Sequence, residues 1–231
     1  LYVLDQEIDS LFKRPVQKIK KPVAEYLNDS IGNDSNRYNE NILYINRYLD
    51  WDEKDTDKVL RFVKEGNTAF ISAGSFSEGL LDSIHAQVNN TPARLNDWSS
   101  MDTSLTIRLY DSCDFFTQIT EDKGILGSYF TRYDTTNSLA LGYLKSDRQD
   151  EVNFIRTALG KGYIFIHLEP AVFTNYFILQ NQYYQYAEQA LSAIPASQQI
   201  FWCLNDQTSK VISDSPLRFI KSQPPLLWAW Y

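Results

Sequence analysis

Short apolar runs alternate with helix-forming stretches in the first half of this sequence, and this alternation constrains the fold more than any other feature. Residues 42–45 are a continuous apolar run of the kind found in buried strands, and residues 68–73 are also predicted to form a buried strand. Between them, residues 52–64 place apolar side chains on one helical face and charges on the other, and Gly66 follows as a C-terminal cap. The alternation predicts an α/β fold with a mostly parallel sheet flanked by helices.

The pattern changes in the middle of the chain, where short strands are predicted one after another. Three alternating runs are separated by polar turns: residues 105–109, 126–130 and 139–144. Residues 152–156 and 163–167 flank a glycine pair at Gly160 and Gly162, which supplies the positive backbone angles of a tight turn and predicts a β-hairpin. We therefore expect an antiparallel excursion over about residues 105–168.

Helical patterns lie on either side of this region, and another strand follows. Near the start of the chain, residues 1–12 carry apolar side chains at helical spacing. After the antiparallel region, an aromatic helical region extends to residue 194. The polar residues 28–41 read as a surface loop, and residues 199–204 as a strand of the same sheet. No linker is long enough to force a second domain, so residues 1–231 are expected to form a single α/β domain.

The end of the sequence is apolar and rich in tryptophan. A membrane-interface belt has the same composition as Leu226, Leu227, Trp228, Ala229, Trp230 and Tyr231. Spanning a bilayer takes about 20 consecutive apolar residues, and residues 1–231 contain no such run. We therefore expect residues 215–231 to lead into a membrane span outside this sequence. The alternative is that the aromatic end packs on the protein core.

The charge of the chain excludes some classes of partner. With 29 acidic and 22 basic residues, the formal net charge is -7, which repels phosphate backbones, so no nucleic acid partner is expected. Cys113 and Cys203 form no Cys-x-x-Cys pair, and the histidine His85 has no ligand at metal spacing, so neither a metal site nor a cofactor is expected. Two buried free thiols are the default, and a single bridge between them stays open.

The turn after residues 68–73 is the first candidate site. Gly74, Ser75, Phe76 and Ser77 lie where a hydrolase would place its nucleophile on a sharp elbow beside backbone N–H groups. Neither serine has a glycine both two residues before it and two residues after it, as such an elbow requires. Ser75 or Ser77 as a helix N-cap accounts for the same residues.

A His-x-Glu pair is the second candidate. His167 and Glu169 lie at the end of the predicted hairpin strand, and residues two apart on a strand point to the same side. A general base and the carboxylate that orients it need this arrangement. The structural alternative is a histidine at a strand end whose hydrogen bonds are satisfied within the core.

Aromatic residues form the third candidate. A platform for sugars or for a partner protein could be made by the rings of the aromatic helical region, which are Phe173, Tyr176, Phe177, Tyr183, Tyr184 and Tyr186. A carbohydrate-binding surface would require several of Trp98, Tyr183, Tyr184 and Tyr186 to be exposed on one face. Phe173, Tyr176 and Phe177 recur at the spacing of a buried helical face. Packing of this region against the sheet is therefore the alternative.

Three segments, residues 51–73, 160–176 and 215–220, together resemble the bacterial domain-of-unknown-function family 4350. The resemblance covers nearly the whole chain. It implies a membrane-anchored protein, with one span before the domain and one after it. It also implies a class I glutamine amidotransferase-like fold, which is a flavodoxin-like parallel sheet.

The resemblance also bears on catalysis. Amidotransferases of that fold use a cysteine on a glycine-flanked elbow together with a His-x-Glu pair, and His167 and Glu169 match the spacing of that pair. Neither Cys113 nor Cys203 has the flanking glycines. The nucleophile is missing, so the resemblance implies a non-catalytic relative.

These observations lead us to expect a binding or assembly module of a membrane-anchored bacterial protein, on the periplasmic side, with other membrane or envelope proteins as possible partners. Its ligand should lie at the carboxyl end of the parallel strands, near Gly74, Ser75, Phe76, His167, Thr174 and Asn175. One alternative is a hydrolase or amidotransferase-like enzyme that uses Ser75 or Ser77 with His167 and Glu169. Another is a carbohydrate-binding surface.

Overall fold

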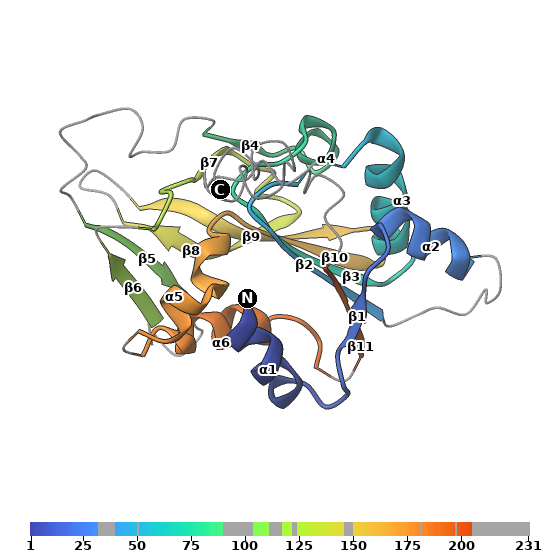
Figure 1. Ribbon diagram of the computed structural model, residues 1–231. Helices are drawn as coiled ribbons and strands as arrows, with labels where there is room; N and C mark the ends of the chain where they lie inside the picture. The colour runs from blue at the N-terminus through green and yellow to red at the C-terminus, as the bar shows by residue number, and fades with distance from the viewer. Residues whose placement is uncertain are drawn as a thin grey trace, which may run out of the picture.

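A nine-stranded mixed sheet forms the centre of the protein, in the order β1-β11-β2-β3-β10-β9-β8-β5-β6 (Figure 1). The computed structural model describes residues 1–31, 40–49, 51–89, 104–110, 117–121, 124–145, 150–180, 182–196 and 198–204. The strands of the sheet are β1 (Gln17–Ile19), β2 (Glu40–Ile45), β3 (Thr68–Ser72), β5 (Leu105–Leu109), β6 (Thr117–Glu121), β8 (Ser138–Leu144), β9 (Glu151–Leu159), β10 (Gly162–His167) and β11 (Gln199–Cys203).

Strand β10 divides the sheet into two halves of different pairing. The strands β1, β11, β2, β3 and β10 pair in parallel. Beyond β10, the strands β9, β8, β5 and β6 all pair antiparallel. The expectation of a flavodoxin-like, mostly parallel sheet flanked by helices, like that of a glutamine amidotransferase, is therefore wrong. The tight β9–β10 turn permits only antiparallel pairing of these two strands. The strands β9, β8, β5 and β6 therefore continue the central sheet and do not form a separate insertion beside it.

Helices cover both faces of the sheet (Figure 1). One face carries α1 (Tyr2–Leu11), the 3-10 helix η2 (Pro170–Phe173), α5 (Asn175–Ile178) and α6 (Tyr184–Ser192). The other face carries α2 (Val23–Ile31), α3 (Glu53–Lys64), α4 (Glu78–Ser83) and the two-stranded ribbon of β4 (Gln87–Val88) and β7 (Phe130–Arg132). Each face buries its own apolar core against the sheet.

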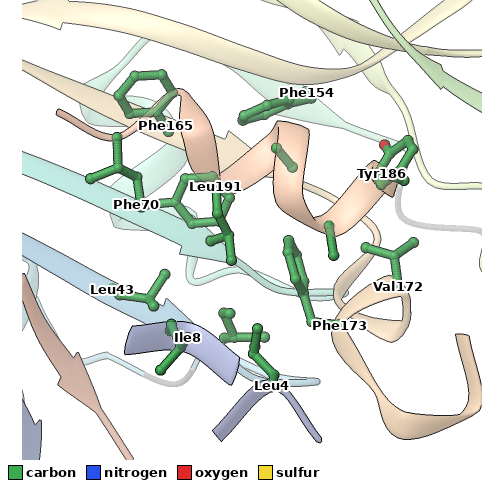
Figure 2. Close-up of a cluster of buried hydrophobic side chains, with 14 of the residues drawn as sticks. Leu4, Ile8, Leu43, Phe70, Phe154, Phe165, Val172, Phe173, Tyr186 and Leu191 are labelled. Carbon is green, nitrogen blue, oxygen red and sulfur yellow. The ribbon is translucent and has the colours of Figure 1, made fainter. Parts of the chain in front are cut away.

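The core under α1 and α6 is rich in aromatic side chains (Figure 2). Phe70 and Phe154 project from the strands, while Phe173 and Tyr186 approach from η2 and α6. Their rings make edge contacts, such as the one between Phe70 and Phe173 with centroids 6.1 Å apart. The prediction that Phe173 and Phe177 are buried is confirmed, but Tyr176 is 51% exposed.

Several elements match the sequence-based predictions. Helix α3 begins after Asp52, whose carboxylate accepts a hydrogen bond from the N–H of Asp55. This bond caps the helix, because it satisfies an N–H group of the first turn that has no partner within the helix. The β9–β10 hairpin turns at Gly160, which has φ of +62°. The expected strand at residues 199–204 is β11, which pairs in parallel with β2.

Other elements differ from the predictions. Residues 126–129 form no strand, although a strand was predicted over residues 126–130, and β7 begins only at Phe130. Strands β1 and β6 were not predicted, and α2 continues to Ile31, into the expected loop. The predicted lead-in at residues 215–231 lies outside the described residues, as do Trp98 and Cys113.

Candidate functional site

A chain of buried hydrogen bonds joins β3, β10 and α6. Ser72 and His167 end their strands as register partners in the parallel β3–β10 pair. The Oγ of Ser72 and the Nδ1 of His167 share a hydrogen bond of 2.8 Å. On the other side of the ring, Nε2 shares a hydrogen bond of 3.2 Å with the hydroxyl of Tyr186. All three residues are fully buried.

The surroundings of His167 keep its imidazole neutral. The rings of Phe70, Phe154 and Phe173 have centroids 6.5, 5.2 and 5.5 Å from that of the imidazole. Burial lowers the pKa of His167 to about 3, because the charged form loses its hydration. A neutral imidazole has one donor and one acceptor nitrogen, so Ser72 and Tyr186 satisfy both in either tautomer.

The carboxylate of Glu169 binds a loop rather than the imidazole. Its oxygens accept hydrogen bonds from the backbone N–H groups of Leu126, Gly127 and Ser128, at 2.9, 2.6 and 3.1 Å. Both nitrogens of His167 already bind other residues. Glu169 therefore does not orient His167, although burial and the negative charge of Glu169 raise the pKa of Tyr186 well above its usual value.

The two serines proposed as nucleophiles lie away from the imidazole. Ser75 is exposed and forms a β-bridge with Tyr48. Ser77 occupies the N-cap position of α4, as one alternative predicted, but its hydroxyl makes no capping hydrogen bond. The hydroxyl that does contact His167 belongs to Ser72. The structure thus does not bring Ser75 or Ser77 together with His167 and Glu169.

A cavity of about 430 Å³ lies at the carboxyl ends of β2 and β10, and we call it the strand-end cavity. Ile45, Asn46 and Arg47 line it from the end of β2. The opposite lining comes from the loop that Glu169 holds and from the start of η2, together with Leu1 and Thr174. Ligand sites of open α/β sheets form at this edge of the sheet. A cavity is therefore present at the carboxyl ends of the parallel strands, where the ligand was expected.

Backbone packing next to Gly74 shapes one wall of the cavity. Its N–H donates a hydrogen bond of 3.0 Å to the carbonyl of Arg47. A Cβ at this position would lie 2.7 Å from Cδ1 of Leu126 and 3.3 Å from that carbonyl oxygen. A larger residue here would require the flexible end of the Leu126 side chain, which lines the cavity, to shift.

The remaining predicted ligand contacts have different positions. Thr174 lines the strand-end cavity. Phe76 packs against the core on the α3 face. Asn175 is structural, because its Oδ1 accepts a hydrogen bond of 2.9 Å from the N–H of Val3 and so fixes α1 against α5.

Arg47 gives the strand-end cavity its charge. Its side chain is exposed, and the guanidinium lies 5.2 Å from the ring centroid of Tyr48. No ion pair joins Arg47 to a carboxylate within the described residues. The rest of the described lining is apolar apart from Asn46, Thr174 and backbone groups. The described lining therefore combines apolar walls with the guanidinium of Arg47.

The described aromatic residues of the predicted platform differ in exposure and do not form a continuous exposed surface. Tyr186 is fully buried, and Tyr183 is half-buried with its hydroxyl donating to the carbonyl of Thr120. Among the described tyrosines of the predicted platform, Tyr184 is exposed at 47% and Tyr176 at 51%.

Neither a metal-binding cluster nor a membrane-spanning helix is present in the described residues. They contain no group of three or more His, Cys, Asp or Glu side chains placed to hold a metal ion. None of their helices combines the length and the apolar character needed to cross a bilayer.

Cys203 is a buried free thiol, and burial raises its pKa to about 12.

Comparison with known families identifies this chain. Residues 12–191 match the family described as Domain of unknown function (DUF4350). The chain therefore belongs to that family. No curated protein matches the sequence.

Solved structures resemble the fold at low sequence identity. The mmIFT52 N-terminal domain aligns with a TM-score of 0.56 and 10% identity, over 84% of this chain and 89% of that domain. An exo-β-1,4-mannosidase from Opitutaceae bacterium strain TAV5 aligns with a TM-score of 0.45 and 13% identity, over 69% of this chain. This chain spans about a quarter of the mannosidase, since 26% of that enzyme is covered. These likenesses concern the fold alone.

Sequence reasoning found His167 and Glu169 but missed their partners. Ser72 was visible as a polar residue ending a buried apolar run, and parallel pairing of that run with residues 163–167 would have placed it beside His167. Tyr186 was assigned to a possible platform instead. Arg47 lies two residues after the end of the apolar run 42–45, so its place just beyond a strand end was the available signal.

The first prediction concerns the pH dependence of stability. His167 holds a pKa of about 3 in place of its ordinary 6.5, so the unfolded chain binds a proton that the native state excludes between these values. The free energy of unfolding should therefore fall as pH drops from 6.5 toward 3, by up to about 1.4 kcal/mol per pH unit. Urea denaturation at a series of pH values measures this slope.

The variant His167→Gln should lose most of that slope between about pH 5 and 6.5. The matched control is His85→Gln, because the imidazole of His85 is exposed. The control should keep the wild-type slope. A wild-type slope in His167→Gln would show that another group causes the pH dependence.

The second prediction concerns Glu169→Gln. The amide would keep one acceptor oxygen but replace the other by an NH2 group, so at least one of the three backbone N–H groups of the loop would face a donor instead of an acceptor. We expect the free energy of unfolding to fall by about 2–4 kcal/mol, measured by urea denaturation. Glu65→Gln removes an exposed carboxylate and should change it by less than about 0.5 kcal/mol. Equal effects of the two variants would refute the anchoring role of Glu169.

Proposed function

We propose that this member of the DUF4350 family is a non-catalytic binding module, and that the strand-end cavity is its ligand site. The ligand we propose is a small molecule with an apolar body and an anionic head group. The observation that carries this proposal is the cavity itself, with apolar walls and Arg47 at its border. Its volume of about 430 Å³ falls in the range of small-molecule sites, about 300–1,000 Å³.

The charge of the ligand follows from the local electrostatics. The chain as a whole carries -7, so it does not attract anions at long range. Charges beyond about 8 Å are largely screened at physiological salt, whereas a guanidinium in contact with a carboxylate or phosphate forms charge-assisted hydrogen bonds. Arg47 has no carboxylate partner among the described residues and can supply them. Asn46 and Thr174 add polar contacts at the same border.

The burial of the polar residues at the strand ends supports a binding role rather than a catalytic one. A general base must reach a proton of the substrate, directly or through one water molecule. His167, Ser72 and Tyr186 are fully buried and satisfy one another. The alternative of a hydrolase or amidotransferase would need Ser75 or Ser77 at His167, and these serines lie elsewhere.

The third prediction tests the ligand class with three probes that share one apolar body: phenylacetate, 2-phenylethanol and 2-phenylethylamine. Phenylacetate should bind most tightly, because only its head group is anionic. In Arg47→Gln this preference should fall by about tenfold, while the neutral probe keeps its affinity. Isothermal titration calorimetry measures all three. Arg132→Gln is the control, since Arg132 is an exposed arginine on β7, away from the cavity.

A cavity-filling variant places the probe. Ala171 lines the strand-end cavity, so Ala171→Leu should abolish phenylacetate binding by occupying its volume. Ala193→Leu enlarges a half-buried alanine that lines a different hollow and should leave binding intact. Tighter binding of the amine than of phenylacetate, or unchanged binding in Ala171→Leu, would contradict the proposal.

We also propose that the module works at a membrane, on the periplasmic side, with membrane or envelope proteins as neighbours. The support is the composition of residues 226–231, where leucine, tryptophan and tyrosine match a membrane-interface belt. The fourth prediction is that the full-length protein sediments with membranes and resists extraction by alkaline carbonate. Recovery of the full-length protein in the soluble fraction would refute it.

A further inference from the structure

We propose that a groove between α1 and the α5–α6 pair binds a short basic amphipathic helix of a partner protein. This helical groove has a volume of about 330 Å³. It shares no lining residue with the strand-end cavity, so it is a second and separate site. The proposal assigns a surface and a kind of partner that a small-ligand site does not require.

One wall of the groove is a single face of α1. Val3, Glu7 and Leu11 lie four residues apart and all line the groove. Residues with this spacing stack along one side of a helix. The eight-residue interval from the first to the last corresponds to about 12 Å along the helix axis. That length matches about two turns of a docked helix.

The facing wall combines apolar and aromatic side chains. Leu179 follows α5 and is 71% exposed, and Tyr184 begins α6 and is 47% exposed. Ala187, on the same face of α6, forms part of the lining. Exposed apolar side chains gathered around a hollow, rather than scattered singly, mark an interaction site. The groove can therefore bury two apolar anchors of a partner.

Two carboxylates determine the charge of the partner. Glu7 on α1 and Glu188 on α6 both line the groove and are exposed. Neither forms an ion pair with another described residue. A lysine or arginine of the partner would complement both. Lys13 and Arg14 follow the end of α1, so the partner's basic residue belongs near the carboxylates rather than at that end.

The same carboxylates argue against a second copy of this chain. In a symmetric contact through the helical groove, each patch meets its own equivalent. Glu7 and Glu188 would then face like charges, and each chain carries -7 in total. A basic helix avoids this repulsion. Apolar anchors at i and i+4 with a lysine on the flank fit the groove, as in other helix-in-groove contacts.

The fifth prediction uses a pair of capped synthetic peptides of about 12 residues. Both have leucine at i and i+4 in an alanine background, and they carry either lysine or glutamate on the flanks. Fluorescence anisotropy with labelled peptides measures their affinity. The lysine peptide should bind at least about tenfold more tightly than the glutamate peptide.

Two variants test the two parts of the site. Leu179→Ser should weaken the lysine peptide about tenfold by removing apolar contact area, whereas Leu139→Ser, at an exposed leucine on β8, should not. The double variant Glu7→Lys with Glu188→Lys should reverse the peptide preference. The double variant Asp57→Lys with Glu65→Lys makes the same change of net charge on α3 and its C-cap, and it should keep the peptide preference.

Three outcomes would overturn the proposal. Equal affinity for the two peptides would show that the carboxylates select nothing. Unchanged binding in Leu179→Ser would place the peptide elsewhere. A dimer in analytical ultracentrifugation that Leu179→Ser dissociates would assign the groove to a second copy of the chain.

Discussion

The parallel pairing of β3 with β10 is the contact on which the rest of the structure depends. It places Ser72 beside His167 at the end of both strands, and the imidazole reaches on to Tyr186 of α6. A helix on one face is thereby joined by hydrogen bonds to the centre of the sheet. On its other edge β10 pairs antiparallel with β9, so the same strand is also where the pairing of the sheet changes.

Glu169, two residues after His167, is a buried carboxylate that fixes the position of a loop. A buried carboxylate costs several kcal/mol in lost hydration unless donors replace the water. Three backbone N–H groups of one loop do so, and that loop becomes a wall of the strand-end cavity. His167 and Glu169 belong to residue types that are common in catalytic sites, but their hydrogen bonds here hold elements of the fold together. What separates the two roles is access, because His167 and Glu169 are both fully buried.

The elements that sequence analysis predicted correctly are those with strong periodicity or continuous burial, such as α3 and β2. Strands β1 and β6 were missed because edge strands bury few side chains, and only Ile19 is buried in β1. The mixed sheet could not be predicted because an apolar run looks alike in parallel and antiparallel pairs. The site shows the same limit: His167 and Glu169 were visible as residue types, but strand register and α6 packing decide what each contacts.

The two proposed sites have opposite charge preferences on one acidic protein, and the range of electrostatic forces explains how this can hold. A net charge of -7 acts through solvent, where screening weakens it beyond about 8 Å. A contact at about 4 Å with an effective dielectric constant of 20 contributes about 4 kcal/mol before desolvation. In these two proposals Arg47 at the cavity and Glu7 at the groove would select by contact, while the net charge would affect mainly the rate of encounter.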